Sequence, residues 1–208
     1  MAEEFDVVVV GAGNAALCAA LAASEQGARV LVLERAPEAE SGGNSRFTAG
    51  GFRFTYNGVE DLQRLMPDLT AQEIANTDFG SYTADQFFDD MFRVTSYRTD
   101  PELCEQLVRR SFETMLWLQS KGVRFVPMYG RQAFKTGSKF KFWGGVTVES
   151  WGGGPGLVDQ EIAAARKAGV AIRYNARVVS LLYDGAAVVG VRVKESAGIS
   201  DIKGKAVV

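Results

Sequence analysis

Two glycines, an alanine and an acidic residue with fixed spacing are the clearest chemical signal in the sequence. Gly11-x-Gly13-x-x-Ala16 follows the valine-rich run at 5–10, and Glu34 stands ~20 residues further on, where an acid of this motif is expected. The first glycine permits a tight turn, and the second lets a diphosphate approach the backbone. The N-terminus of a following helix would offer N–H groups to the phosphates, and Glu34 could accept hydrogen bonds from ribose hydroxyls. The spacing therefore predicts a dinucleotide site.

A strand, a helix and a second strand are needed to position these residues. The run at 5–10 (FDVVVV) predicts a buried parallel strand, and 29–33 (RVLVL) predicts another. Between them, an alanine-rich segment predicts a helix that ends at Gly27. Such a βαβ unit is almost always right-handed. We therefore expect an α/β fold class with a Rossmann-like start.

A second stretch rich in glycine and polar residues spans 41–51 (SGGNSRFTAGG) and shows no helical period. We expect an ordered loop close to a ligand that is longer than ADP-ribose, which favours FAD over NAD. Asn44 and Ser45 could bind the ribitol or the phosphates, and Gly50 and Gly51 would permit backbone contact with the flavin ring. An ordinary surface loop is the alternative.

The adenine-side ribose separates the candidate cofactors further. The Glu34 carboxylate disfavours the 2′-phosphate of NADP, whereas the neighbouring Arg35 would tolerate it. We therefore count Arg35 among the candidate cofactor-binding residues. Two alternatives stay open from these residues: an NAD-dependent dehydrogenase that uses the same fingerprint, and a glycine turn that binds nothing.

The middle of the chain predicts a helical excursion. Helices are expected at 83–97 and 101–121, with Thr83 and Asp100 as their N-caps. The segment 123–150 shows no clear period and is expected to be irregular.

The C-terminal part predicts a return to the nucleotide-binding core. A glycine cluster at 152–156 opens another helix, and a strand is expected at 170–174. Asp184-Gly185 is a strong hairpin signal between expected strands at 177–183 and 187–194. The hairpin should therefore extend the sheet that begins at the N-terminus.

The domain organisation follows from these elements. We expect one FAD-binding domain over 1–208, with a nucleotide-binding core at 1–58 and 145–208 and the helical excursion at 59–144. The last residues, KAVV, look like the start of an apolar strand. A fragment of a longer flavoprotein is therefore favoured over a strand completed by another subunit, because natural domains usually end at surface segments.

Composition excludes several classes of function. Among 208 residues there is no histidine and there are two cysteines, so imidazole metal sites, histidine-based nucleophile systems and a disulfide framework are not expected. The formal net charge of -2 argues against a nucleic-acid binder. No apolar run approaches the ~18–20 residues of a membrane-spanning helix, and the N-terminus lacks a secretory signal. We expect a cytoplasmic protein with no metal site.

Several segments resemble the N-terminal part of the fumarate reductase/succinate dehydrogenase flavoprotein family. They are 7–35 (VVVVGAGNAALCAALAASEQGARVLVLER), 42–45 (GGNS), 49–51 (AGG), the helical segment 100–125, and 152–157 with 172–182. The resemblance covers nearly all of this chain but about the first half of a family member, so the capping domain has no counterpart here. GGNSR and GVRF suggest the tricarballylate dehydrogenase, or CobZ-like, branch.

The resemblance implies an FAD-dependent oxidoreductase of the fumarate reductase type. Hydride would pass between the flavin and a small di- or tricarboxylate, forming or reducing a C=C bond, with an electron-transfer partner in some members. The implied FAD contacts are Gly11, Gly13, Asn14, Ala15, Ala16, Glu34, Gly43, Asn44, Ser45, Gly50 and Gly51, with the backbone of Val178 against the adenine.

Two departures from the family bear on the mechanism. Covalent members carry a histidine where Asn44 stands, so the FAD is expected to be noncovalent. The family's catalytic residues lie beyond position 208, so no catalytic residue is assigned, and the chain by itself is expected to turn over no substrate. A noncatalytic flavin-binding or electron-transfer module is therefore a further alternative.

Overall fold

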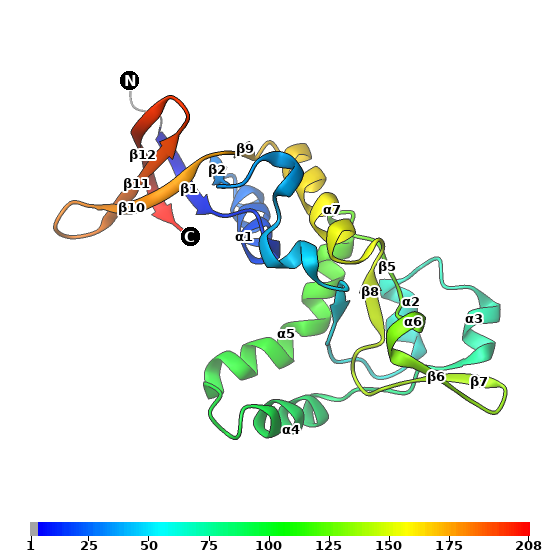
Figure 1. The fold of residues 1–208 in the computed structure, drawn as a ribbon. Helices are drawn as coiled ribbons and strands as arrows, with labels where there is room; N and C mark the ends of the chain where they lie inside the picture. Colours follow the sequence, from blue (N-terminus) through cyan, green and yellow to red (C-terminus); the bar gives the residue numbers. More distant parts are fainter. Residues whose placement is uncertain (1–3) are drawn as a thin grey trace. The chain divides into compact units, whose positions relative to one another are not determined.

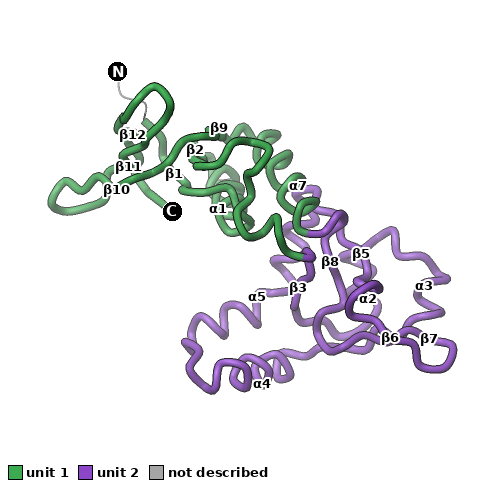
Figure 2. Tube along the Cα trace, in the orientation of Figure 1, with its two compact units in different colours: residues 1–48, 154–208 green, residues 49–153 purple. Residues whose placement is uncertain are grey.

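The chain, described over residues 4–208 in a computed structural model, forms two compact units (Figure 1; Figure 2). Within the described chain, unit 1 comprises 4–48 and 154–208, and unit 2 comprises 49–153. The sequence suggested limits at 58 and 145 for the nucleotide-binding core, and that domain division stays a prediction. Each unit has its own sheet structure and is described separately below.

Unit 1 is built on a six-stranded sheet in the order β10-β11-β12-β1-β2-β9. Its strands are β1 (Glu4–Val10), β2 (Val30–Leu33), β9 (Ala171–Arg173), β10 (Arg177–Tyr183), β11 (Val188–Glu195) and β12 (Gly198–Val207). Neighbours from β12 through β1 and β2 to β9 are parallel, whereas β10, β11 and β12 pair antiparallel. The expected α/β fold class is confirmed.

Helices connect the parallel strands of unit 1 (Figure 1). α1 (Asn14–Glu25) joins β1 to β2, and α7 (Gly153–Lys167) leads into β9. The Ser24 hydroxyl near the end of α1 donates to the Ala168 carbonyl just after α7, 3.1 Å away. Two 3-10 turns, η1 (Glu38–Glu40) and η2 (Gly43–Phe47), follow β2. The 41–51 segment is therefore partly helical, which corrects the expectation of a loop without helical structure.

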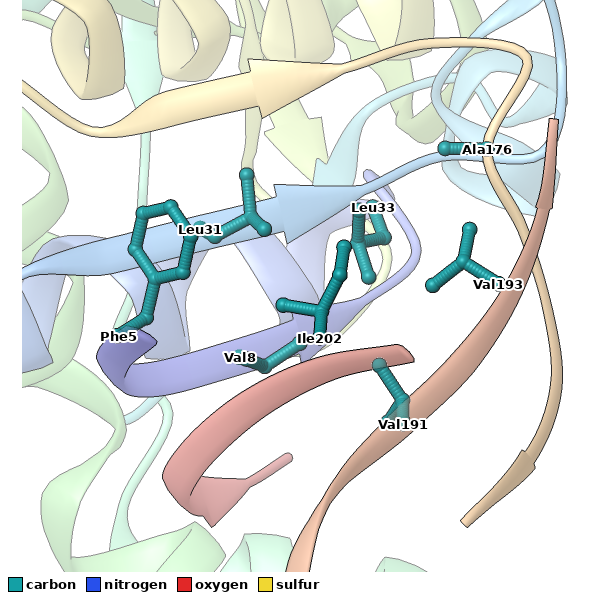
Figure 3. Close-up of a cluster of buried hydrophobic side chains, with 8 residues drawn as sticks. All are labelled: Phe5, Val8, Leu31, Leu33, Ala176, Val191, Val193 and Ile202. Atoms are coloured by element: carbon teal, nitrogen blue, oxygen red, sulfur yellow. The ribbon is translucent and has the colours of Figure 1, made fainter. Parts of the chain in front are cut away.

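One cluster of buried apolar side chains belongs to the core of the sheet, with Ala176 in the link between β9 and β10 and the other members on strands (Figure 3). Its buried members are Phe5, Val8, Leu31, Leu33, Ala176, Val191, Val193 and Ile202. Leu31 and Leu33 on β2 are two positions apart, as are Val191 and Val193 on β11. Because side chains alternate between the two faces of a strand, each pair lies on one face of the sheet. Burial of each such side chain contributes about 1.5–3 kcal/mol, which holds the carboxyl ends of β1 and β2 in place.

The C-terminal strands confirm one expectation and correct another. Asp184-Gly185 lies in the turn between antiparallel β10 and β11, and the Asp184 carboxylate accepts the amides of Ala186 and Ala187. Residues 205–207, however, end a strand of 10 residues and do not begin one, so the expectation that a strand starts at KAVV was wrong. β12 was missed because GISDIKGKAV mixes charges and glycines with few apolar residues.

Unit 2 combines helices with two three-stranded sheets, β3-β8-β5 and β4-β7-β6. Its helices are α2 (Val59–Leu65), α3 (Ala71–Asn76), α4 (Ala84–Val94), α5 (Pro101–Ser120) and α6 (Tyr129–Gln132). Its strands are β3 (Gly51–Phe52), β4 (Thr77–Asp78), β5 (Phe125–Pro127), β6 (Ala133–Thr136), β7 (Lys139–Phe142) and β8 (Val148–Ser150). The segment 123–150 thus holds four strands and a short helix, so the expectation of irregular structure there was wrong.

The two predicted helices of unit 2 start at their predicted caps. The Thr83 hydroxyl accepts the Gln86 amide at 3.3 Å, and the Asp100 carboxylate accepts the Leu103 amide at 2.9 Å. Each cap satisfies an N–H group that has no partner within the first turn of its helix. Across residues 4–208, no helix is both long and apolar enough to cross a membrane.

Candidate functional site

A cleft of about 430 Å³ opens in unit 1 at the carboxyl ends of β1 and β2. Its lining residues are Val10, Gly11, Ala12, Gly13, Leu33, Glu34, Arg35, Gly43, Ala176, Arg177 and Val178. In open α/β sheets, ligands bind beyond the carboxyl ends of the parallel strands, and ligand clefts typically measure ~300–1,000 Å³. Six of the residues predicted from the sequence therefore meet in one cleft.

The glycine turn after β1 provides the floor of this cleft. Gly11 has φ +106°, a conformation that favours glycine, and its amide donates to the Leu33 carbonyl on β2 at 2.8 Å. Gly13 has φ -83°, and an added Cβ would lie 3.4 Å from the Gly42 oxygen, an ordinary contact. The chain's own packing therefore does not require glycine at position 13, whereas a ligand that approaches the backbone would.

The N-terminus of α1 follows directly and faces this turn. Gly13 is its N-cap and has no side chain to cap the helix, and the first turn holds no acidic residue. The partial positive charge of the helix is therefore left for an anionic ligand. Predicted residues Asn14, Ala15 and Ala16 form this first turn, and the Asn14 amide donates to the Ser45 hydroxyl at 3.1 Å. That bond joins the first glycine turn to the second loop.

Glu34 lies at the end of β2 with only 7% of its surface exposed. Its Oε2 accepts the Ala12 amide and its Oε1 accepts the Ala36 amide, both at 2.8 Å. A carboxylate has about four acceptor positions, so each oxygen keeps one for a ligand hydroxyl. Its predicted ribose contact is compatible with this geometry, and the two amides fix its orientation.

The second loop contributes η2 to the same side of unit 1. Gly43 lines the cleft, Ser45 binds α1, and Asn44 is exposed between them. Gly42 was absent from the predicted site, yet it has φ +109°, and an added Cβ would lie 2.7 Å from Val158 on α7. The glycine pair at 42–43 was the available signal, and it marks a place where the loop must pass close to a helix.

Gly50 and Gly51 belong to unit 2 and not to the unit that holds the cleft. Gly50 has φ +72°, and an added Cβ would clash with the Ser150 hydroxyl. A Cβ on Gly51 would lie 3.0 Å from the Met128 sulfur. Packing within unit 2 accounts for both glycines, and their contact with a flavin ring stays a prediction.

Five residues that line the cleft were not predicted, namely Val10, Ala12, Leu33, Ala176 and Arg177. Their positions at strand ends next to predicted residues were the only available signal. Arg177 and the predicted Arg35 are exposed at the cleft and place two cations beside it. An anionic ligand such as a diphosphate suits this combination of cations, backbone amides and a helix N-terminus.

Comparison with known proteins agrees with this geometry. Residues 6–208 match a family model described as an FAD binding domain. The chain is 31% identical over 189 residues to a probable fumarate reductase, Ifc3, of Shewanella frigidimarina (strain NCIMB 400), covering 90% of this chain and 28% of that protein. It is also 31% identical over 191 residues to the KsdD-like steroid dehydrogenase Rv0785 of Mycobacterium tuberculosis (strain ATCC 25618 / H37Rv), covering 90% and 32%.

The fold is also similar to a solved structure. The open conformation of a flavocytochrome c3 fumarate reductase superposes with a TM-score of 0.73 at 30% identity, covering 99% of this chain and 33% of that chain. The chain thus spans about a third or less of the length of these relatives.

Proposed function

The chain belongs to the FAD-binding domain family, among the flavoproteins related to fumarate reductase and succinate dehydrogenase, and from this premise we propose that it holds FAD for an oxidoreductase reaction. The observation that carries the proposal is the cleft beyond β1 and β2, which joins a glycine turn, a helix N-terminus and an oriented buried carboxylate. These features fit the adenosine diphosphate part of FAD.

The residues of the cleft divide the recognition between them. Gly11 and Gly13 leave the backbone open to the diphosphate, and the first turn of α1 supplies N–H groups and positive potential. Glu34 would accept the ribose hydroxyls with its remaining acceptor positions. The backbone of Val178, which lines the cleft, would meet the adenine. Bound FAD supplies the two-electron redox chemistry, and the protein orients the cofactor.

The mode of attachment and the substrate are further parts of the proposal. Asn44 stands where, by the resemblance, covalent members carry a histidine, so we infer noncovalent FAD. Hydride transfer with a small di- or tricarboxylate, such as fumarate or tricarballylate, is supported by the similarity to a fumarate reductase. The similarity to a KsdD-like steroid dehydrogenase makes a steroid the second candidate substrate. A partner that exchanges electrons with the flavin completes the scheme.

Binding of FAD to a Gly13→Ala variant tests the proposal. The added methyl makes only ordinary contacts in the chain, so the variant should fold, but it would obstruct the diphosphate. We expect FAD affinity to fall by roughly tenfold or more, because overpacking costs about 1–3 kcal/mol. Gly130→Ala is the matched control, because its Cβ would meet nothing within 4 Å.

Two outcomes would contradict the proposal. Folded protein that binds neither FAD nor NAD would exclude a dinucleotide site, and equal FAD affinity in Gly13→Ala and wild type would exclude the glycine turn as its cradle. A colourless protein whose melting temperature responds to NAD alone would favour the nicotinamide alternative. Flavin that binds but is never reduced by a carboxylate or steroid would favour a noncatalytic module.

A further inference from the structure

A second buried glutamate lies in unit 1, outside the cofactor cleft. Glu161 is in the middle of α7 and is 0% exposed. Its Oε1 lies 3.6 Å from the Cys18 sulfur on α1, and its Oε2 has no hydrogen-bond partner among the described residues. Buried polar atoms nearly always have a hydrogen-bond partner, so a buried carboxyl group with one unpaired oxygen calls for an explanation.

The Cys18 thiol connects this carboxyl to the first turn of α1. The same sulfur lies 3.5 Å from Oδ1 of Asn14 and 3.6 Å from Oε1 of Glu161. A thiol has one proton, so it can donate to only one of these two oxygens at a time. Whether it donates to Asn14 or to Glu161 depends on which oxygen is the stronger acceptor.

The protonation state of Glu161 decides this choice. A neutral carboxyl can donate its own proton to the sulfur, which leaves the thiol proton for Asn14. An ionised carboxylate is the stronger acceptor and would draw the thiol proton to itself. Asn14 would then lose the thiol that donates to its Oδ1, and its side-chain amide group would be free to rotate. The two states therefore differ in how firmly the side chain at the start of α1 is held.

The surroundings favour the neutral state of Glu161 at neutral pH. Burial raises the pKa of Glu161 to about 8, with the Cys18 hydrogen bond acting in the opposite direction. Burial, followed by the nearby Glu161, raises the pKa of the Cys18 thiol to about 12, so Cys18 stays protonated.

Charged groups on the neighbouring elements are in ion pairs or exposed, the latter including Glu25 of α1 and Glu40 of η1. Arg46 of η2 binds Asp159, and Glu38 of η1 binds Arg166. α1 has no acidic residue in its first turn and no basic residue in its last turn. No cation among the described residues forms an ion pair with Glu161.

We propose that Glu161 is a positioning residue for the cofactor, because through Cys18 it fixes the side-chain amide of Asn14 at the start of α1. Deprotonation of Glu161 releases this side chain and weakens FAD binding. Asn14 directly follows Gly13, which lines the cleft. With its Oδ1 held by the thiol, the Nδ2 group of its side chain would be left to donate to a bound diphosphate. This inference rests on the proposed FAD site, because Asn14 immediately follows the glycine turn of the cleft.

The test is the pH dependence of FAD affinity, measured by quenching of flavin fluorescence on the intact protein. From about pH 6 to about pH 9.5, wild-type affinity should fall by about three- to tenfold, the value of one hydrogen bond. Glu161→Gln cannot ionise, and its amide can still donate to the sulfur, so it should keep the low-pH affinity throughout. Asp159→Asn, on the same helix, should keep the wild-type profile.

Variants at Cys18 test whether Glu161 acts through the Cys18 thiol, a connection called the relay below, or by direct repulsion between the Glu161 carboxylate and the phosphates of FAD. Cys18→Ala breaks the connection, so its affinity should be low and independent of pH. Cys18→Ser keeps a donor and should restore the dependence. Persistence of the wild-type pH profile in Cys18→Ala would overturn the relay, as would a flat wild-type profile or a Glu161→Gln profile like that of wild type. Failure to bind FAD at every pH would instead contradict the proposed function.

Discussion

Two buried glutamates in the same unit have opposite environments. Glu34, at the end of β2, has each carboxylate oxygen 2.8 Å from a backbone amide. Glu161, in the middle of α7, has one oxygen near a thiol and the other without a partner in the described chain. Both side chains are more than nine-tenths buried. Burial alone therefore does not determine how a carboxyl behaves, and the available donors decide between the two cases.

The difference in donors follows from the backbone around each residue. Glu34 ends a strand between two turns, and turn amides such as those of Ala12 and Ala36 are not used in the sheet ladder. Glu161 lies within a helix, where the amides are already bonded to carbonyls four residues earlier. Only a side chain can donate a hydrogen bond to the Glu161 carboxyl, and the Cys18 thiol is one weak donor. Placement at a strand end therefore gives a carboxyl group backbone donors, and placement within a helix leaves it dependent on side-chain donors.

The largest expected effect is the pH dependence of stability at Glu161. Its pKa is raised from 4.5 to about 8, so between these values the folded state keeps a proton that the unfolded state has lost. The free energy of unfolding should fall by about 1.4 kcal/mol per pH unit in that window, with the contribution fully present below it and lost above it. Glu161→Gln lacks this dependence. Its stability relative to wild type should therefore rise across the window and level off above about pH 8.

Urea unfolding of both proteins at several pH values, followed by circular dichroism without added FAD, measures this difference. All other titratable groups are common to the two proteins, so their contributions cancel. A difference in unfolding free energy that stays constant between pH 5 and pH 9 would contradict a neutral Glu161 and would remove the contrast with Glu34.

A smaller effect is expected at Glu34. Glu34→Ala leaves the Ala12 and Ala36 amides without their acceptor, and each unsatisfied group costs about 1–3 kcal/mol. We expect a loss of about 2–4 kcal/mol in unfolding free energy. FAD affinity should fall as well, because the ribose loses its acceptor.

Glu40→Ala serves as the control, since Glu40 is exposed in η1 of the same unit. The measurement is again urea unfolding, together with a titration of FAD. Unchanged stability in Glu34→Ala would show that the two amides find other partners, and would contradict the role given to this carboxylate. Unchanged FAD affinity would separate its structural role from its predicted ribose contact.

The contrast between the two glutamates also shows what the sequence could predict. Glu34 was predicted from a local pattern, a strand end at a known distance from Gly11, and the structure places it in the cleft. Asp184-Gly185, Thr83 and Asp100 were found for the same reason, since a turn or a cap is decided by a few adjacent residues. Glu161 was missed because its partner Cys18 lies 143 positions away in the sequence.

The same limit explains the missed strands of unit 2. β5 and β8 hold 3 residues each, too few to show a period of two. Each is defined by its partner strand and not by its own composition, as in the pairing of Phe125 with Ser150. β12 was overlooked for a related reason, because its place between β1 and β11 overrides a sequence of glycines and charges. Tertiary pairing, which no single segment encodes, therefore accounts for these errors.

The smallest expected effect is at Asp159, two positions before Glu161 on the same helix. Its carboxylate is 2.8 Å from the Arg46 guanidinium, but its side chain is 64% exposed, so water screens the pair. Asp159→Asn should change the unfolding free energy by less than about 1 kcal/mol, and raised salt should reduce that change further. Urea unfolding at low and high salt measures it. A loss of unfolding free energy comparable to that of Glu34→Ala would mean that the Arg46–Asp159 ion pair holds η2 against α7. An exposed carboxylate would then matter as much for stability as the buried Glu34.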